Sequence, residues 1–166
     1  MLWLRPLLLL KLSPMMVLKL YSLEQTKELA RKLLAVARPG DVITLKGDLG
    51  AGKSEFARAF VKAAAGEETV VPSPTFTILE QYQTPLGLIS HFDLYRIEHV
   101  DEIVELGFDE ALTGSIALIE WPERLEGYPL SNLLQLEIAA DPDSEVRTVV
   151  VHADKSWVER IDGIPR

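Results

Sequence analysis

The sequence contains no cysteine, which excludes disulfides, zinc–thiolate centres and cysteine nucleophiles. It also contains no long run of lysine and arginine, and its formal net charge at pH 7 is -8. Proteins that bind nucleic acid by themselves show a basic patch, because neutralising the phosphates supplies most of the affinity. If the protein acts on RNA, we therefore expect it to do so through protein partners.

The leucine-rich start, residues 1–14, falls short of a membrane span because two prolines and two basic residues interrupt it. A signal peptide is also disfavoured, since Lys11 breaks the apolar run and no small-x-small cleavage pattern follows. We interpret these residues as a disordered leader or a mis-assigned start, with Met15 or Met16 as the true first residue. No membrane partner is expected, and we predict a cytoplasmic protein.

The remaining residues, 15–166, have the character of one globular domain. The whole chain is 48% hydrophobic and 25% charged, and 166 residues suffice for one good core but not comfortably for two. Apolar runs alternate with helical patterns, which predicts a single α/β domain, and the glycine-rich motif of residues 47–54 indicates that this domain is of the P-loop NTPase type. Its mixed sheet should have parallel core strands, antiparallel edge strands and helices on both faces.

The expected elements follow from hydrophobic period and turn residues. Ser22 should cap the first helix, with Gln25 completing a capping box. Strands are expected over residues 17–21, 42–45, 76–82, 88–93, 116–119, 133–139 and 146–152, and helices over residues 23–37, 53–65, 100–106, 109–112 and 156–161.

Residues 47–54 read Gly-Asp-Leu-Gly-Ala-Gly-Lys-Ser and fit the phosphate-binding pattern G-x-x-x-x-G-K-[ST] without a mismatch. They follow the apolar run 42–45 directly and precede a helical segment, which is the context that the motif requires. A glycine-rich turn that matches by chance should occur in on the order of one chain in a hundred, and this context makes it rarer. The stretch therefore predicts a nucleotide site.

The residue types of this loop suit a nucleotide phosphate. Glycines let the backbone turn tightly and point successive N–H groups at one phosphate, and the following helix adds the positive end of its dipole. Lys53 would reach the outer phosphates, and the Ser54 hydroxyl would ligate Mg²⁺. We predict that the nucleotide is bound by Asp48, Gly50, Ala51, Gly52, Lys53 and Ser54.

Two apolar strands of the expected sheet end in an acid, one in Asp93 and one in Glu120. The carboxyl ends of parallel strands face the ligand crevice, so both acids should lie near the phosphate loop. Phosphoryl chemistry needs a carboxylate in the magnesium shell and usually another that orients the nucleophile. Both acids are candidates for these roles, although an acid at a strand end can also simply cap the next helix.

Three residues near these acids are further candidates. Thr75 lies between a proline and an aromatic residue and resembles the threonine of a nucleotide-sensing loop. Trp121 either stacks on the base and walls the pocket or packs in the core. His91 shares a strand face with Asp93 and could ligate a metal, but a lone histidine is more often a hydrogen-bonded structural residue.

Five short motifs occur in a specific order. They are residues 47–54, 73–77 (Ser-Pro-Thr-Phe-Thr), 91–96 (His-Phe-Asp-Leu-Tyr-Arg), 105–107 (Glu-Leu-Gly) and 120–122 (Glu-Trp-Pro). In this order and spacing they resemble the bacterial TsaE (YjeE) family, the P-loop ATPases of tRNA threonylcarbamoyladenosine (t6A) biosynthesis. The resemblance covers about residues 17–151.

This resemblance implies an ATPase that uses ATP and Mg²⁺, turns over slowly alone and is stimulated by partners. Those partners are TsaD and TsaB, whose complex transfers a threonylcarbamoyl group to adenosine 37 of tRNA, so that tRNA is met only indirectly. The resemblance implies that Ser54 and Glu120 serve Mg²⁺ and that Asp93 is needed for hydrolysis. We predict Asp93, Lys53 and Thr75 as catalytic residues and Trp121 as part of the nucleotide site.

The family's base contacts lie partly before the loop, which corresponds to about residues 23–26 here. The pair Ser54 and Glu55 departs from the usual Thr-Thr, but serine retains the ligating hydroxyl. The leader has no family counterpart.

Two other functions stay open. One is a small-molecule P-loop kinase, although the arginines are scattered and no arginine-rich lid segment is visible. The other is a nucleotide-gated assembly factor with little turnover, which grades into the first function.

Overall fold

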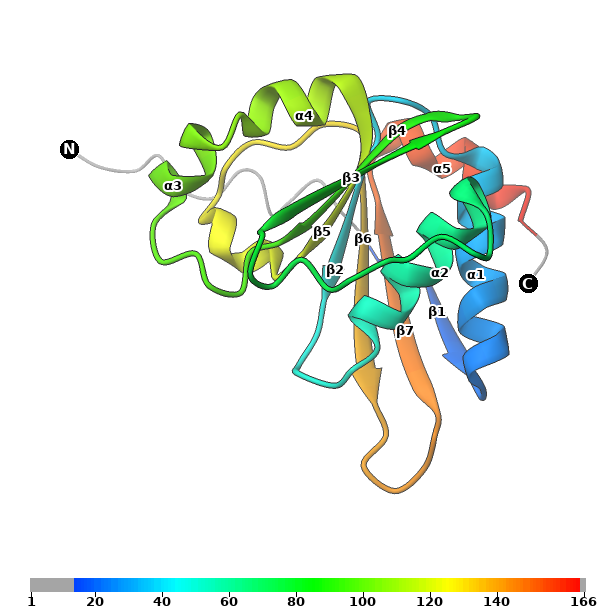
Figure 1. Ribbon diagram of the computed structural model, residues 1–166. Coiled ribbons are helices and arrows are strands. Elements are labelled where there is room, and N and C mark those ends of the chain that lie inside the picture. The colour runs from blue at the N-terminus through cyan, green and yellow to red at the C-terminus, as the bar shows by residue number, and fades with distance from the viewer. Residues whose placement is uncertain (1–13, 165–166) are drawn as a thin grey trace.

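The computed structural model describes residues 14–164, whose strands form one seven-stranded sheet (Figure 1). The strand order is β1-β7-β6-β2-β5-β4-β3. β2 runs parallel to β5 and β6, and β5 runs parallel to β4, whereas β1–β7, β6–β7 and β3–β4 are antiparallel pairs. Parallel core strands with antiparallel edges confirm the predicted fold class.

The seven strands alternate with helices and turns along the chain. The strands are β1 (Pro14–Leu20), β2 (Val42–Lys46), β3 (Leu79–Thr84), β4 (Gly87–Asp93), β5 (Ser115–Glu120), β6 (Leu133–Ala140) and β7 (Arg147–Ala153). The helices are α1 (Leu23–Val36), α2 (Lys53–Ala65), α3 (Val100–Glu105), α4 (Phe108–Gly114), the 3-10 helix η1 (Pro122–Leu125) and α5 (Lys155–Asp162).

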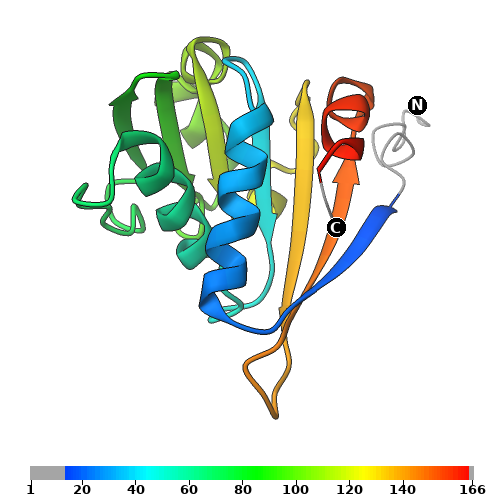
Figure 2. The ribbon, with the colours of Figure 1, turned by 90° about the vertical axis from the view of Figure 1, so that its right-hand side faces the viewer.

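One face of the sheet is covered by α1, α2 and α5, and Figure 2 looks onto this face, with α1 and α2 in front of the strands. Leu33, Phe60 and Trp157, one from each helix, pack in a single buried cluster with Ile43 and Leu118 of the sheet. Burying such apolar side chains is the main stabilising contribution to a fold of this size. This cluster extends across the sheet from β1 to β4.

The opposite face is covered by α3, α4 and η1. There Phe92 of β4 meets Phe108 of α4 edge to face, with ring centroids 5.0 Å apart. This second cluster contains no described residue of β1 or β7. On the same face, Glu137 of β6 and His152 of β7 are only half-buried. Helices therefore cover both faces of the sheet at β2, β4 and β5. At β1 and β7 they cover one face, and the other face of this part of the sheet is called the singly covered side below.

The start of α1 agrees in part with its predicted capping box. The Ser22 side chain accepts a hydrogen bond from the Gln25 backbone N–H at 3.2 Å. The Gln25 side chain reaches one residue further back than predicted and accepts from the Tyr21 N–H at 2.6 Å. Both bonds still satisfy backbone donors at the helix entry.

The strand predicted over residues 76–82 begins only at Leu79. Residues 74–77 form a turn, in which the Ile78 N–H donates to the Pro74 carbonyl at 2.6 Å. Ile78 has φ of 69°, a conformation that a β-branched residue rarely adopts. The prediction failed because the aromatic and β-branched residues 76–78 (Phe-Thr-Ile) are typical of a strand, whereas Phe76 points to solvent with 82% of its surface exposed.

The predicted leader lies outside the described residues, apart from Pro14, which is the first residue of β1. None of the helices within residues 14–164 combines the length and the apolar character that crossing a bilayer requires.

Candidate active site

The phosphate loop connects the end of β2 at Lys46 to the start of α2 at Lys53, as its motif predicted. Gly50 and Gly52 adopt φ of 80° and 113°, which favours glycine. A Cβ atom on Gly47 would lie 2.3 Å from the Ile138 carbonyl oxygen of β6. The loop thus packs directly against the neighbouring strand.

Lys53 lies inside the loop rather than in solvent. Its ammonium donates to the carbonyl oxygens of Gly47 at 2.6 Å and Asp48 at 2.8 Å, and lies 4.2 Å from the centroid of the Trp121 ring. Burial lowers the pKa of Lys53, and the nearby carboxylates, Glu120 foremost, oppose this effect. The two loop carbonyls therefore accept hydrogen bonds from the ammonium that an outer phosphate of a bound nucleotide would otherwise accept.

The two acids lie side by side at the ends of β4 and β5, because Asp93 and Glu120 are register partners in the parallel pair. Glu120 is held from two directions. Ser54 Oγ donates to its Oε2 at 2.9 Å, and His91 Nε2 donates to its Oε1 at 2.8 Å. His91 thus has the hydrogen-bonded role expected of a lone histidine.

Asp93 is joined to the loop that precedes β3. Thr75 Oγ1 donates to its Oδ2 at 2.9 Å, and the Tyr95 backbone N–H donates to its Oδ1 at 3.0 Å. Ser73 Oγ lies 2.8 Å from Thr75 Oγ1. This seats Thr75 beside the second acid of the pocket.

These residues surround a pocket of about 380 Å³. Its lining is Leu49, Gly50, Gly52, Lys53, Ser54, Glu55, Ser73, Thr75, Asp93, Tyr95, Glu120 and Trp121. Of the predicted site residues, only Asp48 and Ala51 are absent from this lining. Asp48 contributes its carbonyl to Lys53, and Ala51 lines the neighbouring pocket.

Ser73 and Tyr95 line the pocket but were not predicted as site residues, although both lie within the family motifs. The Tyr95 ring packs on Trp121 with centroids 5.0 Å apart, and this contact shapes the pocket wall. The motif order contained a signal for both residues, but no spacing argument connected either side chain to the site.

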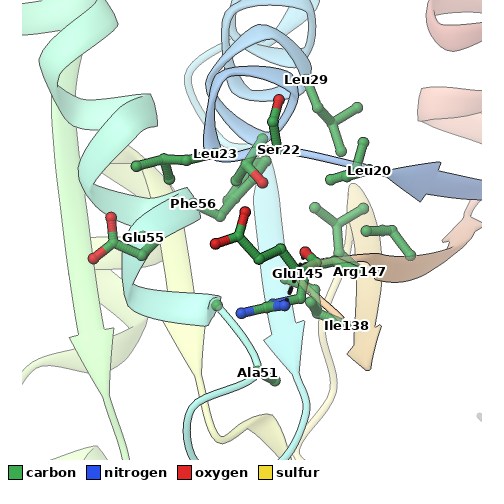
Figure 3. A pocket seen from close by; sticks show the side chains of 14 residues that line it. Leu20, Ser22, Leu23, Leu29, Ala51, Glu55, Phe56, Ile138, Glu145 and Arg147 are labelled. Atoms are coloured by element: carbon green, nitrogen blue, oxygen red, sulfur yellow. Dashed lines mark hydrogen bonds between the residues drawn. The ribbon is translucent and has the colours of Figure 1, made fainter. Parts of the chain in front are cut away.

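A second pocket, of about 340 Å³, adjoins the first and shares Gly52 and Glu55 with it (Figure 3). Its walls include Leu23 and Thr26 of α1, from the region expected to contact the base. Figure 3 shows Arg147, at the start of β7, reaching toward the phosphate loop. The two pockets together offer a polar end and a largely apolar end.

The oxygen atoms near Lys53 suit Mg²⁺. Ser54 Oγ and Glu120 Oε2 lie 2.9 Å apart. Octahedral Mg²⁺ with ligands at 2.0–2.1 Å places neighbouring ligand oxygens about 2.9 Å from one another. No group of three or more His, Cys, Asp or Glu side chains within residues 14–164 could hold a metal ion.

A family model described as "Threonylcarbamoyl adenosine biosynthesis protein TsaE" matches residues 20–149, most of the chain. The chain belongs to the TsaE family. This confirms the family that the five motifs predicted.

Curated members of the TsaE family align over most of their length. A Rickettsia felis protein is 40% identical over 134 residues, which cover 80% of this chain and 78% of the relative. A Bacillus subtilis protein is 40% identical over 131 residues, 77% and 81% of the two chains. Both are named tRNA threonylcarbamoyladenosine biosynthesis protein TsaE.

The fold is also similar to a solved structure, described as the crystal structure of Bacillus subtilis YdiB. The TM-score is 0.74 at 30% sequence identity, and the match covers 91% of this chain and 93% of the other. The whole sheet and its helices, rather than the phosphate loop alone, are thus shared.

Proposed function

We propose that this TsaE-family protein is the cytoplasmic ATPase component of a t6A modification system, hydrolysing ATP with Mg²⁺ to support a TsaD–TsaB transferase complex. The observation that carries the proposal is the convergence of Lys53, Ser54, Glu120 and Asp93 on one pocket at the phosphate loop. The relatives named for tRNA threonylcarbamoyladenosine biosynthesis support the biological role.

The residues divide between binding and hydrolysis. Backbone N–H groups of the loop and the Lys53 ammonium would bind the phosphates, while Ser54 and Glu120 would hold Mg²⁺ between them. A bound Mg²⁺ supplies charge neutralisation for the transferred phosphate. Asp93, whose Oδ2 accepts a hydrogen bond from Thr75, would orient the attacking water and accept its proton.

The neighbouring pocket would take the nucleoside. Leu23, Leu29 and Phe56 give it an apolar lining suited to a base, and it continues into the phosphate loop at Gly52. This arrangement supports the expectation that the base contacts precede the loop in sequence.

Exposed apolar side chains beside the phosphate pocket support a protein partner. Leu49, at the tip of the loop, has 83% of its surface exposed, and Phe76, next to Thr75, has 82% exposed. Contiguous exposed apolar surface marks protein interfaces, and we infer that a partner covers these two side chains. A partner bound there would contact the phosphate loop and the loop that carries Thr75 at once.

A small-molecule kinase is less well supported. Such kinases clamp the transferred phosphate with arginines, but the phosphate pocket is lined by none of the arginines that the structure describes. Arg58 is paired with Glu55 at 2.6 Å, and Arg96 lies over the Phe76 ring.

The test is ATP hydrolysis by the full chain, alone and with a TsaD–TsaB complex added. We expect a slow basal rate that the complex stimulates several-fold. Lys53→Ala should abolish it, whereas Lys62→Ala, a matched change further along α2, should leave it unchanged. If the complex neither binds nor changes the rate, the proposal is wrong and phosphate acceptors should be screened for kinase activity.

A further inference from the structure

Both carboxylate oxygens of Glu120 are hydrogen-bonded, and the two partners lie on different sides. Ser54, on the pocket side, donates to Oε2. His91, which does not line the pocket, donates to Oε1 from outside the pocket. The carboxylate is therefore bonded to α2 through one oxygen and to β4 through the other.

The contact with His91 is fully enclosed. His91 is the register partner of Leu118, two residues before Glu120 on β5, so the two side chains share one face of the sheet. Each side chain has only 2% of its surface exposed, and the contact distance is 2.8 Å. Glu120 thus cannot exchange this donor for water without moving the strands.

The hydrogen-bond network assigns the donor. A carboxylate oxygen only accepts, so the hydrogen of this contact is on Nε2. The other ring nitrogen, Nδ1, is buried and has no hydrogen-bond partner among the described residues. His91 therefore makes one side-chain hydrogen bond, and Glu120 receives it.

We propose that His91 is a positioning residue that fixes Oε1 of Glu120, so that Oε2 alone faces the Mg²⁺ position beside Ser54. This inference rests on the proposed function. The terminal torsion of glutamate is broad, so a carboxylate without this donor can turn. Removing such a supporting partner typically lowers metal affinity by about 10- to 100-fold.

The chain offers a matched control on the singly covered side of the sheet. His152 Nε2 lies 3.5 Å from Glu137 Oε1, with side chains 16% and 39% exposed. This second pair has the same residue types but lies outside the phosphate pocket. His152→Phe therefore removes a comparable ring while leaving Glu120 untouched.

The experiment measures the affinity of the full chain for a fluorescent ADP analogue, without metal and across a Mg²⁺ titration. His91→Phe should raise the Mg²⁺ concentration for half-maximal effect about tenfold or more. It should leave metal-free ADP affinity within about twofold. His91→Gln retains a donor of similar reach and should restore most of the Mg²⁺ response, and His152→Phe should match the parent.

Thermal unfolding is measured first on each variant. If His91→Phe does not fold, His91→Asn replaces it, because its amide is too short to reach Oε1. An unchanged Mg²⁺ response in the donor-less variant overturns the proposal. So does an equal loss of metal-free and Mg²⁺-dependent affinity, which indicates packing alone. A parent protein that ignores Mg²⁺ overturns the proposed function itself, so the two failures are distinguishable.

Discussion

The two halves of the sheet contain the same pair of residue types in opposite settings. In the parallel half, β2, β4 and β5, His91 and Glu120 are buried under helices and bonded at 2.8 Å. In the antiparallel half, β1, β6 and β7, His152 and Glu137 lie on the singly covered side at 3.5 Å. Burial shields the first pair from water and strengthens its hydrogen bond. The second pair makes no hydrogen bond: His152 Nε2 has no hydrogen-bond partner among the described residues, and Glu137 Oε1 accepts from the Gln135 side chain at 2.9 Å instead.

The position of the site follows from the same difference. Parallel strands place their carboxyl ends at one edge, so Asp93 and Glu120 meet the phosphate loop there. The antiparallel pair β6 and β7 is joined by a hairpin instead, and Arg147, the first residue of β7, lines the pocket that we propose for the nucleoside. The parallel half thus carries the residues that we propose for the chemistry, and the antiparallel half supplies one wall of the neighbouring pocket.

The largest effect should come from removing Asp93. Asp93→Ala should lower ATP turnover by about 100-fold or more, because it removes the group that orients the water. Nucleotide affinity should change little. Hydrolysis and binding of a fluorescent nucleotide measure the two effects. Asp141→Ala, in the β6–β7 hairpin, is the control, and an equal loss there would break the comparison between the halves.

The two glutamates sharpen the comparison further. Glu120→Ala should weaken Mg²⁺–nucleotide binding by at least about tenfold. It should also lower the free energy of unfolding by about 1–3 kcal/mol, since it leaves His91 buried without a partner. Glu137→Ala should spare binding and cost at most about 1 kcal/mol. Equal effects of the two changes on binding would contradict the assignment of Glu120.

A third prediction concerns the joint between the halves. Gly47→Ala should destabilise the fold by about 1–3 kcal/mol, because the new Cβ would meet the Ile138 carbonyl at 2.3 Å. Denaturant unfolding measures the cost. Gly114→Ala meets nothing within 4 Å and should be nearly neutral. A neutral Gly47→Ala would show that β6 and the loop separate easily.

The smallest expected effect is the change of nucleotide affinity with pH. Burial lowers the pKa of Lys53, so in the free protein its ammonium loses its proton below the ordinary 10.5. Bound phosphates favour the charged form, so nucleotide affinity should fall as pH rises through the lowered pKa. The fall should be a few-fold and at most about tenfold per pH unit. Affinity in Lys53→Arg should be lower but flat across this window.

Local patterns predicted the parts of the site that depend on neighbours in sequence. The phosphate loop is contiguous, and a strand followed by an acid is visible without knowing its partners. The order of the motifs then predicted the family. Such features need only the period of the chain and the chemistry of its turns.

Contacts set by register were not predictable in this way. The bond between His91 and Glu120 depends on β4 and β5 being adjacent and parallel with one particular offset. The contribution of Arg147 to the nucleoside pocket depends on how far the β6–β7 hairpin extends. The strand predicted to include Ile78 was wrong for a different reason. The spacing of apolar residues carries no information about a left-handed backbone at one position.

The left-handed turn at Ile78 also gives the protein a natural reporter. The Ile78 carbonyl accepts the hydrogen bond of the Asp93 N–H at 3.0 Å. That amide hydrogen is protected from deuterium exchange only while the turn keeps this hydrogen bond. Its exchange rate would therefore record, without an attached probe, how often the segment bearing Thr75 opens and whether nucleotide or a partner keeps it closed.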